Sequence, residues 1–249
     1  MPKEELNAVG PLLTAWHHGA RLAFAIEHQN WQVHQWSPVL YTDESRFTLN
    51  HVADMKGFGE AMENVMLPDV TLDPDTASPY LILSADGKQV THGDTRQDLP
   101  DTPERINTSI AVLGKQSFSS GRFYYEVQVR EKTAWTVGVA KESINRKGKI
   151  SLTPQSGFWT VALRNENQYK ACADPPVLLT LREKVEVVGV FVDYEEGLVS
   201  FYDVKSRSHI YSFTGQCFTV KLYPFFSPGL NDGGKNSAPL IISPVFKTE

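Results

Sequence analysis

The stretch "VEVVGVFVDYEEGLVSFYDV", residues 185–204, decides the fold. Its first part, residues 185–192, is apolar at nearly every position, which is typical of a strand buried on both faces. Glu195-Glu196-Gly197 then interrupts the apolar run and predicts a turn, because glycine supplies backbone conformations that tight turns need. A second strand follows. The stretch therefore predicts a hairpin at the centre of an antiparallel sheet.

Other segments repeat strand patterns. "RFYYEVQV" (122–129) alternates, so that its apolar residues face one way and its polar residues the other. "AWTVGVA" (134–140) repeats the alternation, and "LILSADGKQVTH" (81–92) places Asp86-Gly87 between two short strands. "SHIYSF" (208–213) and "APLIISPV" (238–245) are further short strands. Turn signals recur about every ten residues without a helical segment, which predicts an all-β fold, a two-sheet antiparallel β-sandwich.

The composition limits the possible functions. The 249 residues are 41% hydrophobic, with a formal net charge of -5, so a cationic surface for nucleic acid is not expected. Cys172 and Cys217 suit neither a disulfide framework nor a zinc site, and each is predicted to be a small buried residue. No run reaches the roughly 20 apolar residues that span a bilayer, and the N-terminus lacks a signal-peptide pattern. We expect a cytoplasmic protein with no membrane part in this chain.

The N-terminal quarter has a different character. "TAWHHGARLAFAIEHQNWQVHQW" (14–36) predicts a helix, because Leu22, Ala25 and Ile26 recur at helical spacing and residues 21–37 contain neither glycine nor proline. Pro38 ends that helix. "VLYTDESRFTL" (39–49) then predicts a strand. We expect a short helical and strand appendage over residues 1–55, a linker over 56–67, and the β domain over 68–246.

Motifs that carry chemistry are weak. "GLNDGGK" (229–235) matches the spacing of a phosphate-binding loop, but Asn236 stands where a Ser or Thr must hold magnesium, and a β run follows instead of a helix. We expect a loop between strands. No metal-ligand pattern or nucleophile motif is present, so neither enzyme activity nor a metal or cofactor is predicted. The basic segment "INRKGK" (144–149) is either a solvated loop or a contact loop for an acidic partner.

Several motifs together resemble a known family. "VTLDPDTASPYLILSADGKQV" (70–90) resembles a PRY segment. "FSSGRFYYEVQV" (118–129), "AWTVGVA" and "LYPFFSPGLNDGG" (222–234) resemble successive SPRY motifs. Residues 68–246 thus resemble the PRY-SPRY (B30.2) domains of tripartite-motif ubiquitin ligases and butyrophilin-like proteins. The resemblance implies a β-sandwich that binds a protein ligand through loops at one end and catalyses nothing itself.

The resemblance also places candidate ligand-binding residues. Antibody-binding members of the family use an Asp, two Trp and a Phe, and the matching positions here are Thr136, Ala162, Arg164 and Leu230. All four depart from that pattern, which implies a different protein ligand. Asn231 and Asp232 retain the loop pattern and are expected to supply polar contacts.

Two roles follow from the resemblance. The first is protein recognition, as the substrate-recognition part in ubiquitination or in innate immunity. The alternative is a sensor of a phosphorylated small molecule in a butyrophilin-like basic pocket, with which Arg164 is compatible. A phosphate pocket would favour several converging basic groups.

The N-terminal segment resembles a second family. "RLAFAIEHQNWQVHQWSPVLYTDESRFTL" (21–49) is similar to mariner-like transposases around their first catalytic aspartate, which would be Asp43. That resemblance covers about residues 12–50 and stops before the two further carboxylates that a two-metal site requires. Glu44 cannot substitute, because adjacent strand residues point to opposite faces. We expect a weakly ordered transposase fragment without nuclease activity.

Overall fold

The computed structural model describes residues 65–148 and 150–244. Within them, Leu67–Pro244 forms one compact unit, and Val65 and Met66 belong to a separate one. A single 3-10 turn, η1 (Pro154–Ser156), is the only helical element of this part of the chain. The strands are β1 (Val65–Met66), β2 (Leu81–Leu83), β3 (Gln89–His92), β4 (Val112–Leu113), β5 (Arg122–Gln128), β6 (Trp135–Lys141), β7 (Phe158–Arg164), β8 (Gln168–Ala171), β9 (Val177–Leu179), β10 (Val187–Asp193), β11 (Leu198–Asp203), β12 (Ser208–Phe213), β13 (Leu222–Ser227) and β14 (Leu240–Ile242).

The larger sheet has the strand order β12-β11-β10-β5-β14-β3-β2. β10 lies inside this sheet and pairs antiparallel with β11 on one side and β5 on the other, so that Val190 lies opposite both Phe201 and Tyr125. All residues of β10 are buried, as expected for a strand that is apolar on both faces. The predicted hairpin of residues 81–92 forms at the other edge, where β2 pairs with β3.

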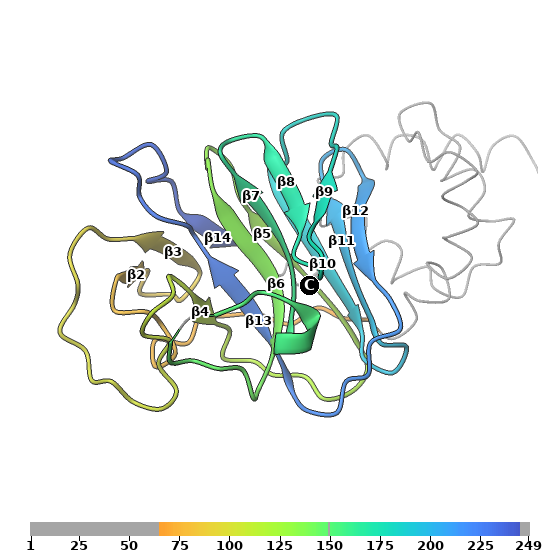
Figure 1. Ribbon diagram of the computed structural model, residues 1–249, viewed down its shortest axis with the longest axis horizontal. Coiled ribbons are helices and arrows are strands. Elements are labelled where there is room, and N and C mark those ends of the chain that lie inside the picture. Colours follow the sequence, from red (N-terminus) through yellow and green to blue (C-terminus); the bar gives the residue numbers. More distant parts are fainter. Residues whose placement is uncertain (1–64, 149, 245–249) are drawn as a thin grey trace, which may run out of the picture. The chain divides into compact units, whose positions relative to one another are not determined.

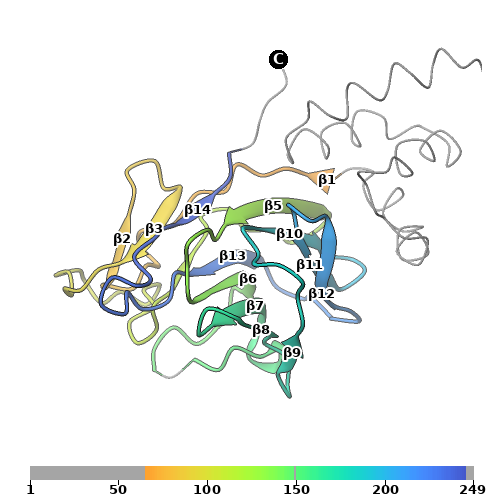
Figure 2. The ribbon, with the colours of Figure 1, turned by 90° about the horizontal axis from the view of Figure 1, so that it is seen from above.

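The smaller sheet has the order β4-β13-β6-β7-β8-β9 and is also antiparallel. Seen from above, β5, β10, β11 and β12 lie in one layer, and β6, β7, β8 and β9 lie in the other (Figure 2). Val137 of β6 lies opposite Val161 of β7 and Phe226 of β13, so that three neighbouring strands present apolar side chains to the same face.

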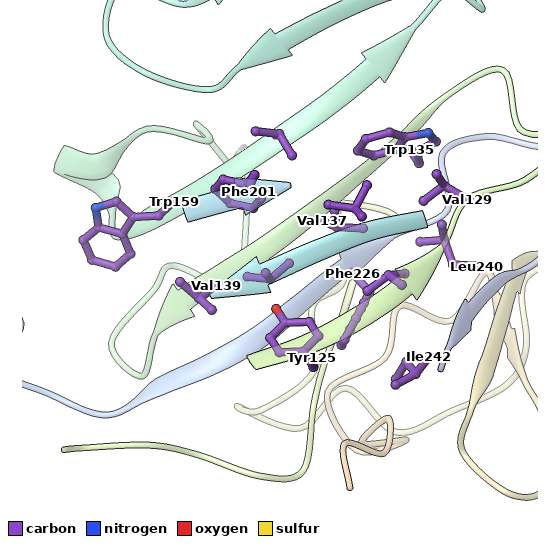
Figure 3. Packing of buried hydrophobic residues seen from close by; sticks show 14 of the residues in the cluster. Tyr125, Val129, Trp135, Val137, Val139, Trp159, Phe201, Phe226, Leu240 and Ile242 are labelled. Carbon is purple, nitrogen blue, oxygen red and sulfur yellow. The ribbon is translucent and has the colours of Figure 1, made fainter. Parts of the chain in front are cut away.

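The main core fills the space between the two sheets (Figure 3). Residues of β5 alternate between buried and half-buried, and Phe123, Tyr125 and Val127 face this core. The Tyr125 hydroxyl donates a hydrogen bond of 2.5 Å to the Gly138 carbonyl of β6, which satisfies a buried polar group and links the two layers. In β5, alternation in the sequence therefore predicts which residues face the core.

A second apolar cluster covers part of the outer face of the smaller sheet. Its buried members are Ile106, Ala111, Leu113, Ala140, Ile144, Phe158 and Phe225. Ala140 lies opposite Phe158, and both point away from the main core because their strand neighbours Val139 and Trp159 point into it. The rings of Phe158 and Phe225 meet edge to face, with centroids 5.4 Å apart. Loops before β4 and after β6 thus close this half of the outer face.

The structure confirms the all-β, two-sheet antiparallel sandwich. Predictions for the N-terminal helix, the strand over 39–49 and the transposase resemblance with Asp43 lie outside the described residues, and the domain boundaries stay predictions. The described residues contain no helix that is long and apolar enough to cross a membrane. Cys172 is buried as predicted, but the same prediction for Cys217 is wrong. Cys217 lies exposed in the loop between β12 and β13, whereas Cys172 directly follows β8 and is buried against it.

Candidate functional site

Three loops meet at one end of the sandwich, and we call them the loop end. They are the β5–β6 loop (129–134), the β7–β8 loop (165–167) and the β13–β14 loop (228–239), which projects at the upper left in Figure 1. The Glu166 amide donates to the Thr133 carbonyl at 2.9 Å, which joins the first two loops. The third is joined through Asn236, whose Oδ1 accepts a hydrogen bond from the Thr133 amide at 2.9 Å.

The loop end concentrates unusual backbone conformations. Non-glycine residues with positive φ in the described residues are Glu131, Asn165, Glu166, Arg207 and Asp232. Four of these five lie in the three loops. A positive φ is unfavourable for a residue with a Cβ and persists only where surrounding contacts impose it. The loop end is therefore held in a defined shape, as expected of loops that present binding groups on a rigid scaffold.

Asn236 is the main connection between these loops. Its side chain is buried, at 2% exposure, and uses both ends of the amide. Oδ1 accepts from the amides of Thr133 and Ala134, whereas Nδ2 donates to the carbonyls of Ala134, Pro228 and Leu230 at 2.9–3.0 Å. The residue that rules out a phosphate-binding loop in the sequence is therefore the residue that fixes the loop. β14 follows it, as predicted for a loop between strands.

Lys132 of the β5–β6 loop also holds the β13–β14 loop. Its side chain is fully buried, and its Nζ donates to the carbonyls of Asn236 and Ala238 at 3.2 and 2.6 Å. No carboxylate among the described residues pairs with it. Burial without a counter-ion disfavours the charged ammonium and lowers the pKa of Lys132 to about 8.

Arg164 ends β7 beside the loop end. Its Nη1 donates to the Trp135 and Leu163 carbonyls, each at 2.7 Å, and its Nη2 donates to Thr136 Oγ1 at 2.8 Å. These acceptors belong to β6 and β7, so the sheet itself fixes the guanidinium. Burial lowers the pKa of Arg164, although an arginine keeps its charge at neutral pH.

Strand register places further residues on the same outer face. Thr136 lies opposite Ala162, Ala162 lies opposite Lys170, and Lys170 lies opposite Leu178, so these four residues form a row across β6 to β9. Arg164 is two residues after Ala162 and shares its face. We call these five residues the open half of the outer face, in contrast to the half closed by the second apolar cluster. Leu178 is 79% exposed at the edge of the sheet.

The β13–β14 loop carries the other predicted residues. Leu230 is 62% exposed, and Asp232 is also exposed. Asn231 forms hydrogen bonds within the protein. Its backbone N–H donates to His92 Nδ1 at 3.2 Å, and its side-chain Nδ2 donates to Asp94 Oδ1 at 2.9 Å. An exposed leucine and an exposed aspartate thus stand on a backbone that neighbouring segments hold.

The structure brings the predicted residues together in two groups. Thr136, Ala162 and Arg164 are neighbours on β6 and β7, and Leu230, Asn231 and Asp232 share one loop. Thr136 and Ala162 are buried, with 1% and 0% exposure, and Thr136 serves as an acceptor for Arg164. Ligand contact by all six residues stays a prediction. Sequence reasoning did not identify Lys132, Lys170 or Leu178, and it considered Asn236 only as a departure from the phosphate-loop motif. Their importance depends on contacts between distant segments.

Two further candidates are the basic segment 144–149 and a possible metal site. In the basic segment 144–149, Lys147 forms an ion pair with Asp101 and also donates to the Thr102 carbonyl at 2.6 Å. Arg146 donates to the carbonyls of Glu104 and Glu142, each at 3.1 Å. These contacts fix the loop to its neighbours. The described ranges contain no group of three or more His, Cys, Asp or Glu residues that could hold a metal ion.

Two family models match the sequence. The SPRY-associated domain matches residues 70–118, and the SPRY domain matches residues 122–241; together they cover more than half of the chain. Pyrin from Homo sapiens is 51% identical over 177 residues, which are 71% of this chain and 23% of pyrin. The E3 ubiquitin-protein ligase TRIM69 from Rattus norvegicus is 47% identical over 184 residues, which are 73% of this chain and 36% of that protein. The chain thus spans well under half the length of these relatives.

Solved structures agree with this match. The TRIM65 PSpry domain superposes with a TM-score of 0.60 at 22% identity, covering 71% of this chain and 91% of that one, which shows the common fold. Stonustoxin gives the same TM-score at 26% identity, covering 71% of this chain and 29% of its own. Apart from β1 and the last residue of β14, the strands of both sheets and the loop end lie within the residues matched by the two family models, so the chain belongs to the PRY-SPRY (B30.2) family.

Proposed function

We propose that this chain is a non-catalytic recognition module that binds a protein ligand through the loop end and the adjoining open half. The observation that carries the proposal is the state of the β13–β14 loop. Asn236 and Lys132 fix its backbone with hydrogen bonds, and yet Leu230 is left 62% exposed at its tip. A large apolar side chain held out by a rigid loop is the kind of group that anchors protein interfaces.

The setting of this recognition rests on the relatives. TRIM69 is named an E3 ubiquitin-protein ligase, and the residues that this chain shares with it are the PRY and SPRY parts. We propose that the chain selects a protein for ubiquitination or takes part in innate immunity, and that it acts in the cytoplasm. Catalysis of ubiquitin transfer would then reside outside the residues matched here.

A capture experiment tests the proposal. The full chain is immobilised and incubated with cell lysate, and retained proteins are identified, purified and titrated against it. Wild type is compared with the double variant Arg164→Glu, Leu230→Asp and with Lys221→Glu, an exposed charge reversal beside the opposite end of β13. We expect a partner whose affinity falls at least tenfold in the double variant and is unchanged in Lys221→Glu. A partner equally retained by a folded double variant would contradict binding at the loop end.

A phosphorylated small molecule is the second candidate. Arg164 and Lys170 point from the same face of the smaller sheet, and two cations on one face favour an anionic ligand. Inorganic pyrophosphate should then raise the melting temperature of wild type and should not raise that of Arg164→Ala. An equal shift in both proteins would remove this candidate.

A further inference from the structure

Arg164 has hydrogen-bond donors that the protein does not use. A guanidinium carries five N–H groups. Three of them are directed at the Trp135 carbonyl, the Leu163 carbonyl and Thr136 Oγ1. Within residues 65–148 and 150–244, Nε has no hydrogen-bond partner, and no carboxylate lies within ion-pair distance of the side chain. Nε–H and one Nη2–H therefore remain available.

These two donors are suited to a carboxylate. Nε–H and Nη2–H can form a fork that matches the two oxygens of a carboxylate, and such bidentate pairs are among the stronger polar contacts in proteins. The three internal acceptors are all neutral oxygens, so they orient the guanidinium without neutralising it. A half-buried charge without a counter-ion is unfavourable, and a ligand that supplies one relieves that cost.

Arg105 shows that neutral acceptors alone do not make a site. Its guanidinium also donates to carbonyls, those of Pro100, Pro74 and Ala77, at 2.7–2.9 Å. It is only 4% exposed, so a ligand cannot reach it. Arg164 differs because it is only partly buried and lies at the end of β7, next to the loops. Access, together with the unused fork, distinguishes Arg164 from this structural arginine.

A short path of contacts connects Arg164 with the exposed Leu230. Arg164 binds the Trp135 carbonyl, and the preceding residue, Ala134, binds Asn236 Nδ2 through its own carbonyl. The same Nδ2 binds the Leu230 carbonyl at 2.9 Å. The guanidinium and the backbone that carries Leu230 are therefore linked through the same set of hydrogen bonds.

We propose that the ligand of this site is an extended peptide segment of a protein, which places an Asp or Glu carboxylate on the free edge of Arg164 and a neighbouring apolar side chain on Leu230. The proposal rests on the proposed function and names its chemistry. The net charge of -5 gives the protein no long-range attraction for acidic ligands, so the preference must come from this local contact. A phosphate favours several converging basic groups, and Lys170 is the only other basic residue among the five of the open half.

A peptide selection tests the chemistry. A phage library of random 12-residue peptides is selected on the full wild-type chain. We expect Asp or Glu at one fixed position of the selected peptides and a large apolar residue at a second fixed position, because Arg164 and Leu230 belong to one hydrogen-bonded set of loops. Replacing that acid by its amide, Asp→Asn or Glu→Gln, should weaken binding of a synthetic peptide at least tenfold, since the charge-assisted pair is lost.

A charge swap gives the sharper control. Selection on Arg164→Glu should enrich Lys or Arg at the position where wild type selects an acid, and Arg164→Lys should keep the acid preference at lower affinity because it lacks the fork. Lys221→Glu should select the wild-type peptides. Melting temperatures establish that each variant is folded, and Arg164→Lys keeps the test decisive if Arg164→Glu does not fold.

The outcomes separate this inference from the proposed function. Peptides that require Leu230 but show no acid preference would overturn the carboxylate and leave recognition at the loop end standing. Displacement of the selected peptides by millimolar inorganic phosphate would also overturn it, in favour of a phosphate ligand. Peptides that bind equally to wild type, Arg164→Glu and Leu230→Asp would contradict the proposed function itself.

Discussion

The outer face of the smaller sheet has two halves that are built from the same strands and covered in different ways. In the closed half, Phe158 of β7 and Phe225 of β13 pack beneath loops that contribute Ile106 and Ile144. In the open half, the same β7 ends in Arg164, and no apolar loop residue belongs to its row. Along β7, Phe158 lies on this face in the closed half, and Ala162 lies on it four residues later in the open half.

This difference shows where stability and recognition reside. Apolar burial closes one half and leaves no group for a ligand. The open half keeps a charge without a counter-ion, which lowers stability, and exposes Leu178 at its edge. The adjoining loop end exposes Leu230, so this part of the molecule provides binding groups. One sheet therefore serves as a support at one end and as a docking surface at the other. Variants in the two halves should separate these roles.

The largest loss of stability is expected from Phe158→Ala in the closed half. Phe158 is 1% exposed and packs edge to face on Phe225. Truncating a buried phenylalanine costs about 3–5 kcal/mol, because it removes contacts and leaves a cavity. Urea denaturation measures this change, and the exposed Leu178→Ala serves as a control with little effect. A cost below about 1 kcal/mol would mean that the second cluster is not a true core.

A smaller loss of stability is expected from Asn236→Ala. Asn236 holds the β13–β14 loop, which belongs to the loop end. The variant removes an amide that makes five hydrogen bonds, and it leaves the half-buried backbone N–H of Thr133 and the buried carbonyl of Pro228 without partners. Each unsatisfied group costs about 1–3 kcal/mol, and partial relaxation should limit the total to about 2–4 kcal/mol. Asn167→Ala, in the exposed β7–β8 loop, is the matched control. A loss no larger than that of the control would show that the loop is held by other means.

Much of this architecture could be predicted from the sequence. Residues 185–204 predict the β10–β11 hairpin, because a strand buried on both faces is apolar at nearly every position. The alternation in β5 indicates which side of that strand faces the core. Strands β8 and β9 were not predicted, since "QYKA" is largely polar and "VLL" has only three residues after Pro175-Pro176. The position of Arg164 came from family resemblance. Its acceptors lie on another strand and could not be derived from local pattern.

The contacts behind the loop end are the least predictable part. Lys132 and Asn236 are separated by 104 residues, and their hydrogen bond joins the loop after β5 to the loop before β14. From sequence alone, a lysine in a loop is expected to be exposed to solvent, because lysine is rarely buried without a partner. Only the fold shows that this one is enclosed. The buried charge in turn makes a distinct prediction about pH.

The stability of the loop end should depend on Lys132 ionisation. The folded pKa is about 8, below the model-peptide value of 10.5, so between these values the unfolded chain binds more protons and stability rises with pH. From pH 7 to 9.5, this one group should add about 2 kcal/mol to the free energy of unfolding. The rise should be absent in Lys132→Met, which has no ionisable group. Urea denaturation of both proteins across this range gives the difference, and parallel pH profiles would show that Lys132 is not desolvated.

Leu230→Asp is expected to have the smallest effect on stability. Its effect on binding should nevertheless be large. Leu230 is 62% exposed, and its backbone is held by Asn236 whatever the side chain is. Substitutions at such exposed positions usually change stability by less than about 0.5 kcal/mol. Nevertheless, a partner that uses this side chain should lose at least tenfold in affinity, because an exposed anchor contributes only when a ligand covers it. Phe158→Leu is the counterpart in the closed half: it should lower stability and leave the affinity of the folded protein unchanged. If Leu230→Asp destabilised the fold as much as Phe158→Leu, or if both variants weakened binding equally, the two halves would not have separate roles.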